Sequence, residues 1–159
     1  MCDIFKSLSF TVPRILVVTG GGDGGYTKKT EVWPKPESQC TLPDFPLKVG
    51  GAVGFWTAQG PMVCGGYGGG NKCFLYKKLQ WMPSTNMRTS RLFASASQVN
   101  PNQAIILGGF GGNYLKSTEL ITSTGSEDGK DFPVTIRYHC SFKINSTLAL
   151  VTGGNQDGS

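Results

Sequence analysis

The chain has 159 residues and a formal net charge of +5, from 15 Lys and Arg residues against 10 Asp and Glu residues. The basic residues are scattered, whereas a nucleic-acid surface would gather them on one face, so nucleic-acid binding is not expected. No stretch of about 18 apolar residues occurs, so no membrane span is expected. With 23 glycines, 9 prolines and 38% hydrophobic residues, the composition favours one all-β domain with many turns.

Residues 1–13 precede the first strand that the sequence predicts. They lack the apolar core and the small-residue cleavage site of a signal peptide. From residue 14 onward, short strands bounded by Gly, Pro and Asn follow one another, without a window of helical period. We expect an N-terminal segment over 1–13, a repeat region over 14–154 and a C-terminal tail over 155–159.

Four glycine pairs give the chain an internal period of about 44 residues. The pairs are Gly21-Gly22, Gly65-Gly66, Gly108-Gly109 and Gly153-Gly154. Glycine permits the positive φ and the close backbone approach that crowded strand ends require. A period of this size indicates repeated supersecondary units that bury their apolar faces against one another.

Each repeat is predicted to contain four strands. Apolar runs before the glycine pairs are the second strands, at 15–18, 61–64, 104–107 and 148–151. Third strands follow at 30–33, 73–76 and 118–121, a fourth is clearest at 80–82, and new first strands lie at 51–56, 92–98 and 138–144. Four strands in about 44 residues match one blade of a β-propeller.

The predicted propeller is partial. Residues 49–83 and 91–133 are whole four-stranded blades, 14–46 supplies strands two to four of an earlier blade, and 138–152 supplies strands one and two of a later blade. A propeller closes with about 4–8 blades, and the open blade faces would expose apolar surface that finds a partner. We expect the missing blades to come from a longer protein, or from self-association of this chain.

The motifs resemble the kelch repeat. An apolar strand and a glycine pair are followed by a Thr-Glu strand, then by Trp81-Met82-Pro83 and Met87-Arg88. The second unit fits this pattern best. In the first unit Trp33 comes too early to be the fourth-strand tryptophan, and in the third unit Phe132 is the candidate replacement for it. The resemblance implies a non-enzymatic module that binds other proteins.

A finer resemblance is to cysteine-containing, secreted kelch-type proteins of invertebrates. It rests on residues 38–46, on Cys64, Cys73 and Cys140, and on the Val-Thr-Gly-Gly sequence over 151–154. The resemblance and the cysteines favour an extracellular protein, whereas the absence of a signal peptide at residue 1 opposes it. Truncation of a longer chain would reconcile the two observations.

The loops between strands two and three, and between strands four and one, are predicted to open on one face of the propeller. Loops on a rigid scaffold often carry function, and aromatic and arginine residues are favoured as interface anchors. The candidate partner-binding residues are Tyr26, Lys28, Tyr67, Lys72, Arg88, Phe110, Asn113, Tyr114 and Lys116. The alternative is that these loops are ordinary solvated turns.

The five cysteines contain no C-x-x-C spacing, so a zinc site is not expected. Cys64 ends a second strand and Cys73 begins the following third strand. A hairpin places them opposite each other, within reach of a disulfide if their side chains share a face. In an oxidising compartment we expect this bridge, and in a reducing one we expect small apolar core residues.

Cofactor binding and catalysis are not predicted. The run over 20–25 matches G-x-G-x-x-G, but a strand follows it where a dinucleotide site needs a helix. His139 is the only histidine, and adjacent strand residues point to opposite faces, so it should not meet Cys140. A copper site like that of galactose oxidase needs two histidines. The Ser-Glu-Asp-Gly sequence over 126–129 is interpreted as a solvated turn.

Asn145-Ser146-Thr147 is an N-glycosylation sequon between two predicted strands, where a hairpin tip would accommodate a glycan. Together, the sequence predicts a partial kelch-type propeller that binds a protein partner through loops on one face. The alternative is the non-catalytic portion of a larger galactose oxidase-like or carbohydrate-active propeller enzyme, with its catalytic residues outside this chain.

Overall fold

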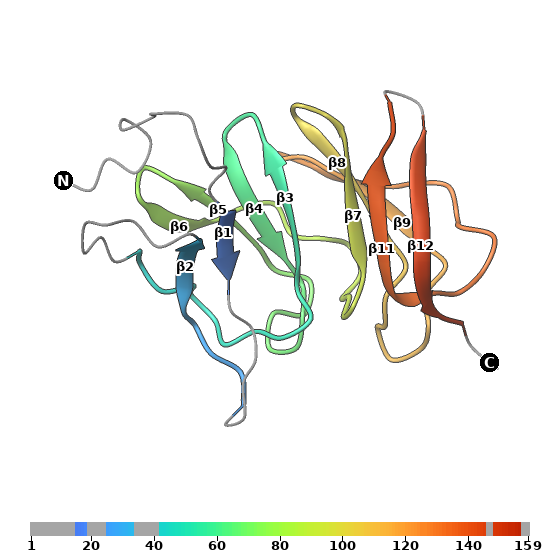
Figure 1. Cartoon of the computed structure of the whole chain (residues 1–159), viewed down its shortest axis with the longest axis horizontal. Helices are drawn as coiled ribbons and strands as arrows, with labels where there is room; N and C mark the ends of the chain where they lie inside the picture. The colour runs from blue at the N-terminus through green and yellow to red at the C-terminus, as the bar shows by residue number, and fades with distance from the viewer. Residues whose placement is uncertain (1–14, 19–24, 34–41, 146–147, 157–159) are drawn as a thin grey trace.

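The computed structural model describes residues 15–18, 25–33, 42–145 and 148–156, which form strands and turns without a helix (Figure 1). The strands are β1 (Ile15–Val18), β2 (Thr30–Trp33), β3 (Val53–Thr57), β4 (Gly60–Cys64), β5 (Cys73–Lys77), β6 (Gln80–Pro83), β7 (Ser95–Asn100), β8 (Gln103–Leu107), β9 (Thr118–Ile121), β10 (Ser126–Asp128), β11 (Arg137–Lys143) and β12 (Ala149–Asn155). The expectation of an all-β fold is confirmed for these residues.

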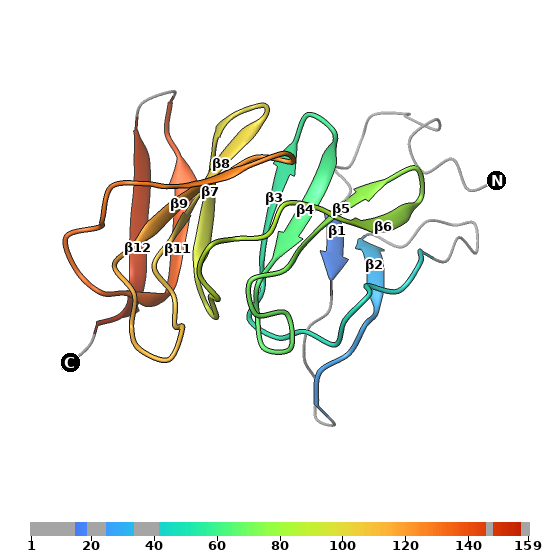
Figure 2. The same ribbon diagram turned by 180° about the vertical axis from the view of Figure 1, so that it is seen from behind.

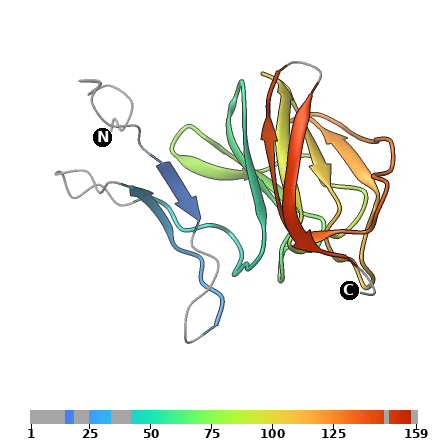
Figure 3. The same cartoon turned by 45° about the vertical axis from the view of Figure 1, so that its right-hand side comes forward.

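Two four-stranded antiparallel sheets form the centre of the molecule. Strands β3 to β6 make one sheet in chain order, and strands β7 to β10 make the next. The pairs β1–β2 and β11–β12 form two-stranded sheets, which flank the central sheets in Figures 1 and 2. Strand β3 contacts β7, and β7 contacts β11, so successive sheets stand side by side (Figure 3).

The fourth strand of the second sheet differs from expectation. Residues 126–129, interpreted as a solvated turn, include β10, which pairs with β9 in the register Ser126 to Ile121 and Asp128 to Glu119. Phe132 is not part of this strand. Its N–H donates to Lys116 O at 2.7 Å in the following loop. The turn prediction was wrong because a polar strand at a sheet edge has no apolar alternation to reveal it.

An apolar core joins the two central sheets. Val53, Phe55 and Met62 of the first sheet pack in one cluster with Ala104 and Ile106 of the second. Because alternate residues of a strand share a face, the predicted alternation places these side chains between the sheets. The opposite face of the first sheet carries a second, aromatic cluster. Its members are Phe45, Val49, Val63, Phe74, Tyr76 and Trp81.

Two of the glycine pairs, Gly65-Gly66 and Gly108-Gly109, connect one sheet to the next. Gly66 N donates to Arg91 O at 2.8 Å, and Gly109 N donates to Ile136 O at 2.7 Å. Gly66 has a φ of 83°, and a Cβ added there would lie 2.9 Å from Ala52 N. The second glycine of these pairs is therefore required both by its conformation and by the close passage of the backbone segment that enters the same sheet.

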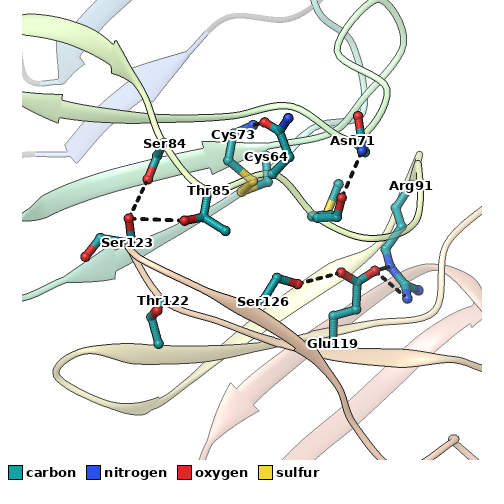
Figure 4. Close-up of a disulfide and its surroundings, with 12 residues drawn as sticks. Cys64, Asn71, Cys73, Ser84, Thr85, Arg91, Glu119, Thr122, Ser123 and Ser126 are labelled. Carbon is teal, nitrogen blue, oxygen red and sulfur yellow. Dashed lines mark hydrogen bonds and ion pairs between the residues drawn. A yellow bond between two sulfur atoms is a disulfide. The ribbon is translucent and has the colours of Figure 1, made fainter.

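A buried ion pair lies in the connection between the two central sheets (Figure 4). The side chains of Arg91 and Glu119 are both fully buried, with Arg91 Nη2 3.0 Å from Glu119 Oε1. Glu119 also accepts hydrogen bonds from the backbone N–H groups of Arg88 and Thr89 and from Ser126 Oγ. This carboxylate therefore ties the segment between β6 and β7 to the face of β9.

The guanidinium of Arg91 is equally well paired. Its Nη1 donates to Gly108 O at 2.7 Å and to Ser117 O at 2.8 Å, and its Nη2 donates to Ser117 Oγ at 2.9 Å. A buried ion pair stabilises a fold only when further hydrogen bonds offset the desolvation of both charges. Here those bonds are present on both partners.

Removing one partner of this pair should destabilise the whole fold. We expect Arg91→Met to lower the free energy of unfolding by about 3–5 kcal/mol, because Glu119 would stay buried without its cation. Urea denaturation followed by circular dichroism measures the loss. Arg88→Met is the matched control: Arg88 pairs with Asp128 on the surface, so about 1 kcal/mol or less is expected. Equal losses in the two variants would contradict the assignment.

The contact between the second sheet and β11–β12 is polar. Ser95 and Ser97 of β7 are buried, as is His139 of the neighbouring strand β11. Their side-chain polar atoms, with Ser141 Oγ, have no hydrogen-bond partner among the described residues. Burial lowers the pKa of His139, because the charged imidazolium loses its hydration.

The stability of the fold should therefore fall in weak acid. In the unfolded chain the histidine has a pKa of about 6.5, whereas the pKa of folded His139 is lower. Between these two pKa values the unfolded chain binds a proton that the folded chain does not. We expect the free energy of unfolding to fall between pH 7 and pH 5, by up to about 1.4 kcal/mol per pH unit. Urea titrations at several pH values measure it. His139→Gln, which removes the only histidine, should flatten this slope, and an unchanged slope would refute the assignment.

Candidate functional site

The loops that follow the second strands lie at one end of the sheets, next to the segments that enter the first strands. Isolated bridges pair Gly50 with Tyr67 and Leu92 with Phe110. A third pairs Thr27 with Val49. The predicted loops and the entry segments thus form one layer of backbone, which positions the side chains described next.

Three equivalent residues at the entries to β3, β7 and β11 adopt the left-handed backbone conformation. Their φ angles are 63° at Gly51, 54° at Phe93 and 57° at Tyr138. Phe93 N donates to Gly51 O at 2.9 Å, and Tyr138 N donates to Phe93 O at 2.9 Å. Bulky residues at positive φ are strained, and such strain concentrates at binding and catalytic sites.

The aromatic rings at these positions are stacked. The rings of Phe93 and Tyr138 lie 4.2 Å apart and are inclined by 29°. A Cβ added to Gly51 would collide with the Phe93 ring, so each ring extends over the equivalent position of the preceding sheet. The Tyr138 ring is the exposed end of this stack.

Arg137 lies among three aromatic rings beside the stack. Its guanidinium carbon is 4.2 Å from the centre of the Tyr114 ring, 5.0 Å from that of Tyr138 and 5.5 Å from that of Phe110. Cation–π contacts of this kind favour a guanidinium held flat against a ring. We call these residues, with Phe93, the aromatic–arginine surface.

Arg137 differs from the other arginines that the structure describes. Arg88 is paired with Asp128 and Arg91 with Glu119. Within the described part of the chain no carboxylate pairs with Arg137, and its buried Nε has no hydrogen-bond partner. Among the described residues, the contacts that orient this cation are those with the rings of Phe110, Tyr114 and Tyr138.

The predicted loop residues fall into three groups. Tyr26 and Tyr67 are exposed and in contact, with ring centres 4.7 Å apart, and Phe110 and Tyr114 belong to the aromatic–arginine surface. Lys28, Lys72 and Asn113 are exposed. Arg88 and Lys116 form exposed ion pairs with Asp128 and Asp131. These two cations are engaged within the chain.

Sequence reasoning missed Phe93, Arg137 and Tyr138 as site residues. Their signal was available in the repeat, because Gly51, Phe93 and Tyr138 recur at nearly the spacing of the glycine pairs. Aligning the repeats on those pairs would have placed two aromatic residues opposite a glycine. Nothing in the local sequence, however, indicates that Arg137 lies against Phe110 and Tyr114.

The predicted disulfide between Cys64 and Cys73 is present and buried (Figure 4). These residues are direct cross-strand partners of β4 and β5, as the hairpin argument required. Cys140 is exposed with a free thiol, while neighbouring His139 is buried, so their side chains lie on opposite faces as predicted. Cys2 and Cys40 lie outside the described residues.

Asn145 is exposed in the turn between β11 and β12, where the glycan was predicted. Ser146 and Thr147 of that sequon lie outside the described residues. Among the residues that the structure describes, no group of His, Cys, Asp and Glu side chains is arranged to hold a metal ion. The same residues contain no helix long and apolar enough to cross a membrane.

Comparison with known proteins supports the fold alone. The sequence matches no family model and no curated protein. Among solved structures, the chain is similar to that of YjhT, with a TM-score of 0.64 and 19% sequence identity. The similarity covers 73% of this chain and 37% of the YjhT chain, so this chain spans well under half of that protein's length.

A methyl group at position 51 should disturb the aromatic stack. We expect Gly51→Ala to destabilise the fold by about 1 kcal/mol more than Gly70→Ala. Both glycines have a φ of 63°, but a Cβ at Gly70 makes only an ordinary contact with Ser90 Oγ at 3.6 Å, whereas one at Gly51 collides with Phe93. Urea denaturation measures both losses. The excess should shrink when Phe93→Ala is the background, and an excess that persists would show that Phe93 is not its cause.

Proposed function

We propose that this chain is a partial kelch-type β-propeller that binds a protein partner through its loop face without catalysing a reaction. Two consecutive four-stranded antiparallel sheets, with neighbouring first strands, have the strand order of propeller blades. The recurrent glycine pairs at positive φ support the same interpretation. On this proposal the β1–β2 and β11–β12 sheets are parts of two further blades.

One observation carries the proposal of a binding face: Arg137 is held by aromatic rings and lacks a carboxylate partner among the described residues. A planar guanidinium stacked on rings keeps its edge donors free for a carboxylate, and its orientation is set before binding. Tyr138 and Tyr67 add exposed aromatic surface of the kind that anchors protein interfaces. The proposed partner supplies an acidic side chain to Arg137.

We propose an extracellular location for the protein. The buried bridge between Cys64 and Cys73 would persist in an oxidising compartment and is rare in reducing ones. Glycosylation at Asn145 is part of the same proposal, because Asn145 itself is exposed.

Comparative affinity capture tests the function. The immobilised chain, its Arg137→Met variant and its Lys77→Met variant are incubated with extract from the source tissue, and bound proteins are identified by quantitative mass spectrometry. Both substitutions remove one positive charge, but Lys77 lies at the opposite end of β5, where it contacts Gln59. We expect a partner retained by the wild type and by Lys77→Met, and depleted at least tenfold by Arg137→Met. Equal capture by all three proteins would refute this site.

A further inference from the structure

The last sheet of the chain has one exposed apolar face. Phe142 of β11 and Leu150 of β12 are cross-strand partners, and Ile144 N donates to Leu148 O at 2.9 Å beyond them. These four side chains are 51–57% exposed. Cys140, two residues before Phe142, shares their face because alternate strand residues point the same way. We call these five residues the apolar end face.

The opposite face of the same sheet is covered. His139 is buried, and Lys143 Nζ donates to Val99 O at 2.7 Å on the neighbouring strand β7. The charged side chain of Lys143 therefore lies on the face turned to the second sheet. The five residues of the apolar end face include no charged group.

In the first central sheet, the equivalent face is covered by a neighbouring sheet. Val53 lies two residues after the left-handed Gly51 and pairs with Cys64, which directly precedes a glycine pair. Phe55, two residues further along β3, pairs with Met62. Cys140 and Phe142 hold the same positions after Tyr138, and their partners precede the next glycine pair. In the first sheet these positions are at most 8% exposed, because another sheet packs on them.

The other end of the molecule is a poor match for this face. Thr30 of β2 is buried and accepts a hydrogen bond from Trp81 Nε1 at 3.2 Å, so it faces the first central sheet. The next residue, Glu31, is exposed and lies on the outer face of β2. Covering Glu31 with apolar side chains would remove its carboxylate from water without a partner.

We propose that two copies of this chain associate through their apolar end faces, one β11–β12 sheet packing on the other about a two-fold axis. An isologous contact of this kind requires a self-complementary surface. The apolar end face meets that requirement because its five residues carry no charge. Two chains of net charge +5 can therefore associate there without bringing like charges into contact. This inference does not depend on the proposed loop-face partner.

The mass of the full chain in solution tests the association. Sedimentation velocity over about 1–100 μM should show a reversible dimer of twice the 17.0 kDa chain mass. We expect Leu150→Lys to raise the dissociation constant at least tenfold, because the interface would bury an unpaired ammonium group. Met82→Lys is the control, since Met82 is also exposed but lies on β6. Its dimer should be unaffected, and circular dichroism verifies that both variants fold.

Cross-linking at Cys140 identifies the face. A short bismaleimide should join two chains at Cys140, giving a dimer whose linked peptide is found by mass spectrometry and is lost in Cys140→Ser. A monomer throughout the concentration range would overturn the proposal. So would a dimer that persists in Leu150→Lys, an assembly larger than a dimer, or the absence of a Cys140–Cys140 link in a dimer.

Discussion

The arrangement of the two complete sheets depends on the buried ion pair between Arg91 and Glu119. Glu119 projects from β9 toward the segment that leaves the first sheet, and its oxygens accept from two backbone N–H groups of that segment. Arg91 donates to the carbonyls of Gly108 and Ser117, at the two ends of the loop between β8 and β9. One pair of charges thus satisfies polar groups from the segment between β6 and β7 and from both ends of the β8–β9 loop.

In the first central sheet, the positions equivalent to this ion pair are apolar. Val49 and Phe74 occupy the positions equivalent to Arg91 and Glu119, and both are buried in the aromatic cluster with Phe45 and Trp81. Ring centres of Phe45 and Trp81 lie 4.9 Å apart in an edge-to-face contact. The repeat therefore conserves backbone geometry while its sheet contacts change from apolar to ionic. This follows because strand pairing and glycine conformation set the geometry, whereas packing against neighbours sets the chemistry.

The aromatic–arginine surface arises from the same repeated backbone. A left-handed residue lies just before β3 and β7 and at the start of β11, and successive copies are joined by N–H to O=C hydrogen bonds. Glycine at position 51 leaves room for the Phe93 ring, which in turn supports Tyr138. The strain of two bulky residues at positive φ is offset by this stacking and by the contacts of Arg137 with its rings.

Local features of the sequence were sufficient for most of the fold. The strands 15–18, 30–33 and 118–121 begin and end as predicted, and hairpin geometry placed Cys64 opposite Cys73, where the structure has a disulfide. Alternation, turn glycines and short-range pairing are properties of nearby residues, so the sequence alone determined most of the strands, their repeat and the pairing of Cys64 with Cys73. The polar edge strand β10, the partners of Arg91 and the rings around Arg137 were decided only by tertiary structure. They depend on side chains distant in the chain, which meet only when the sheets pack together.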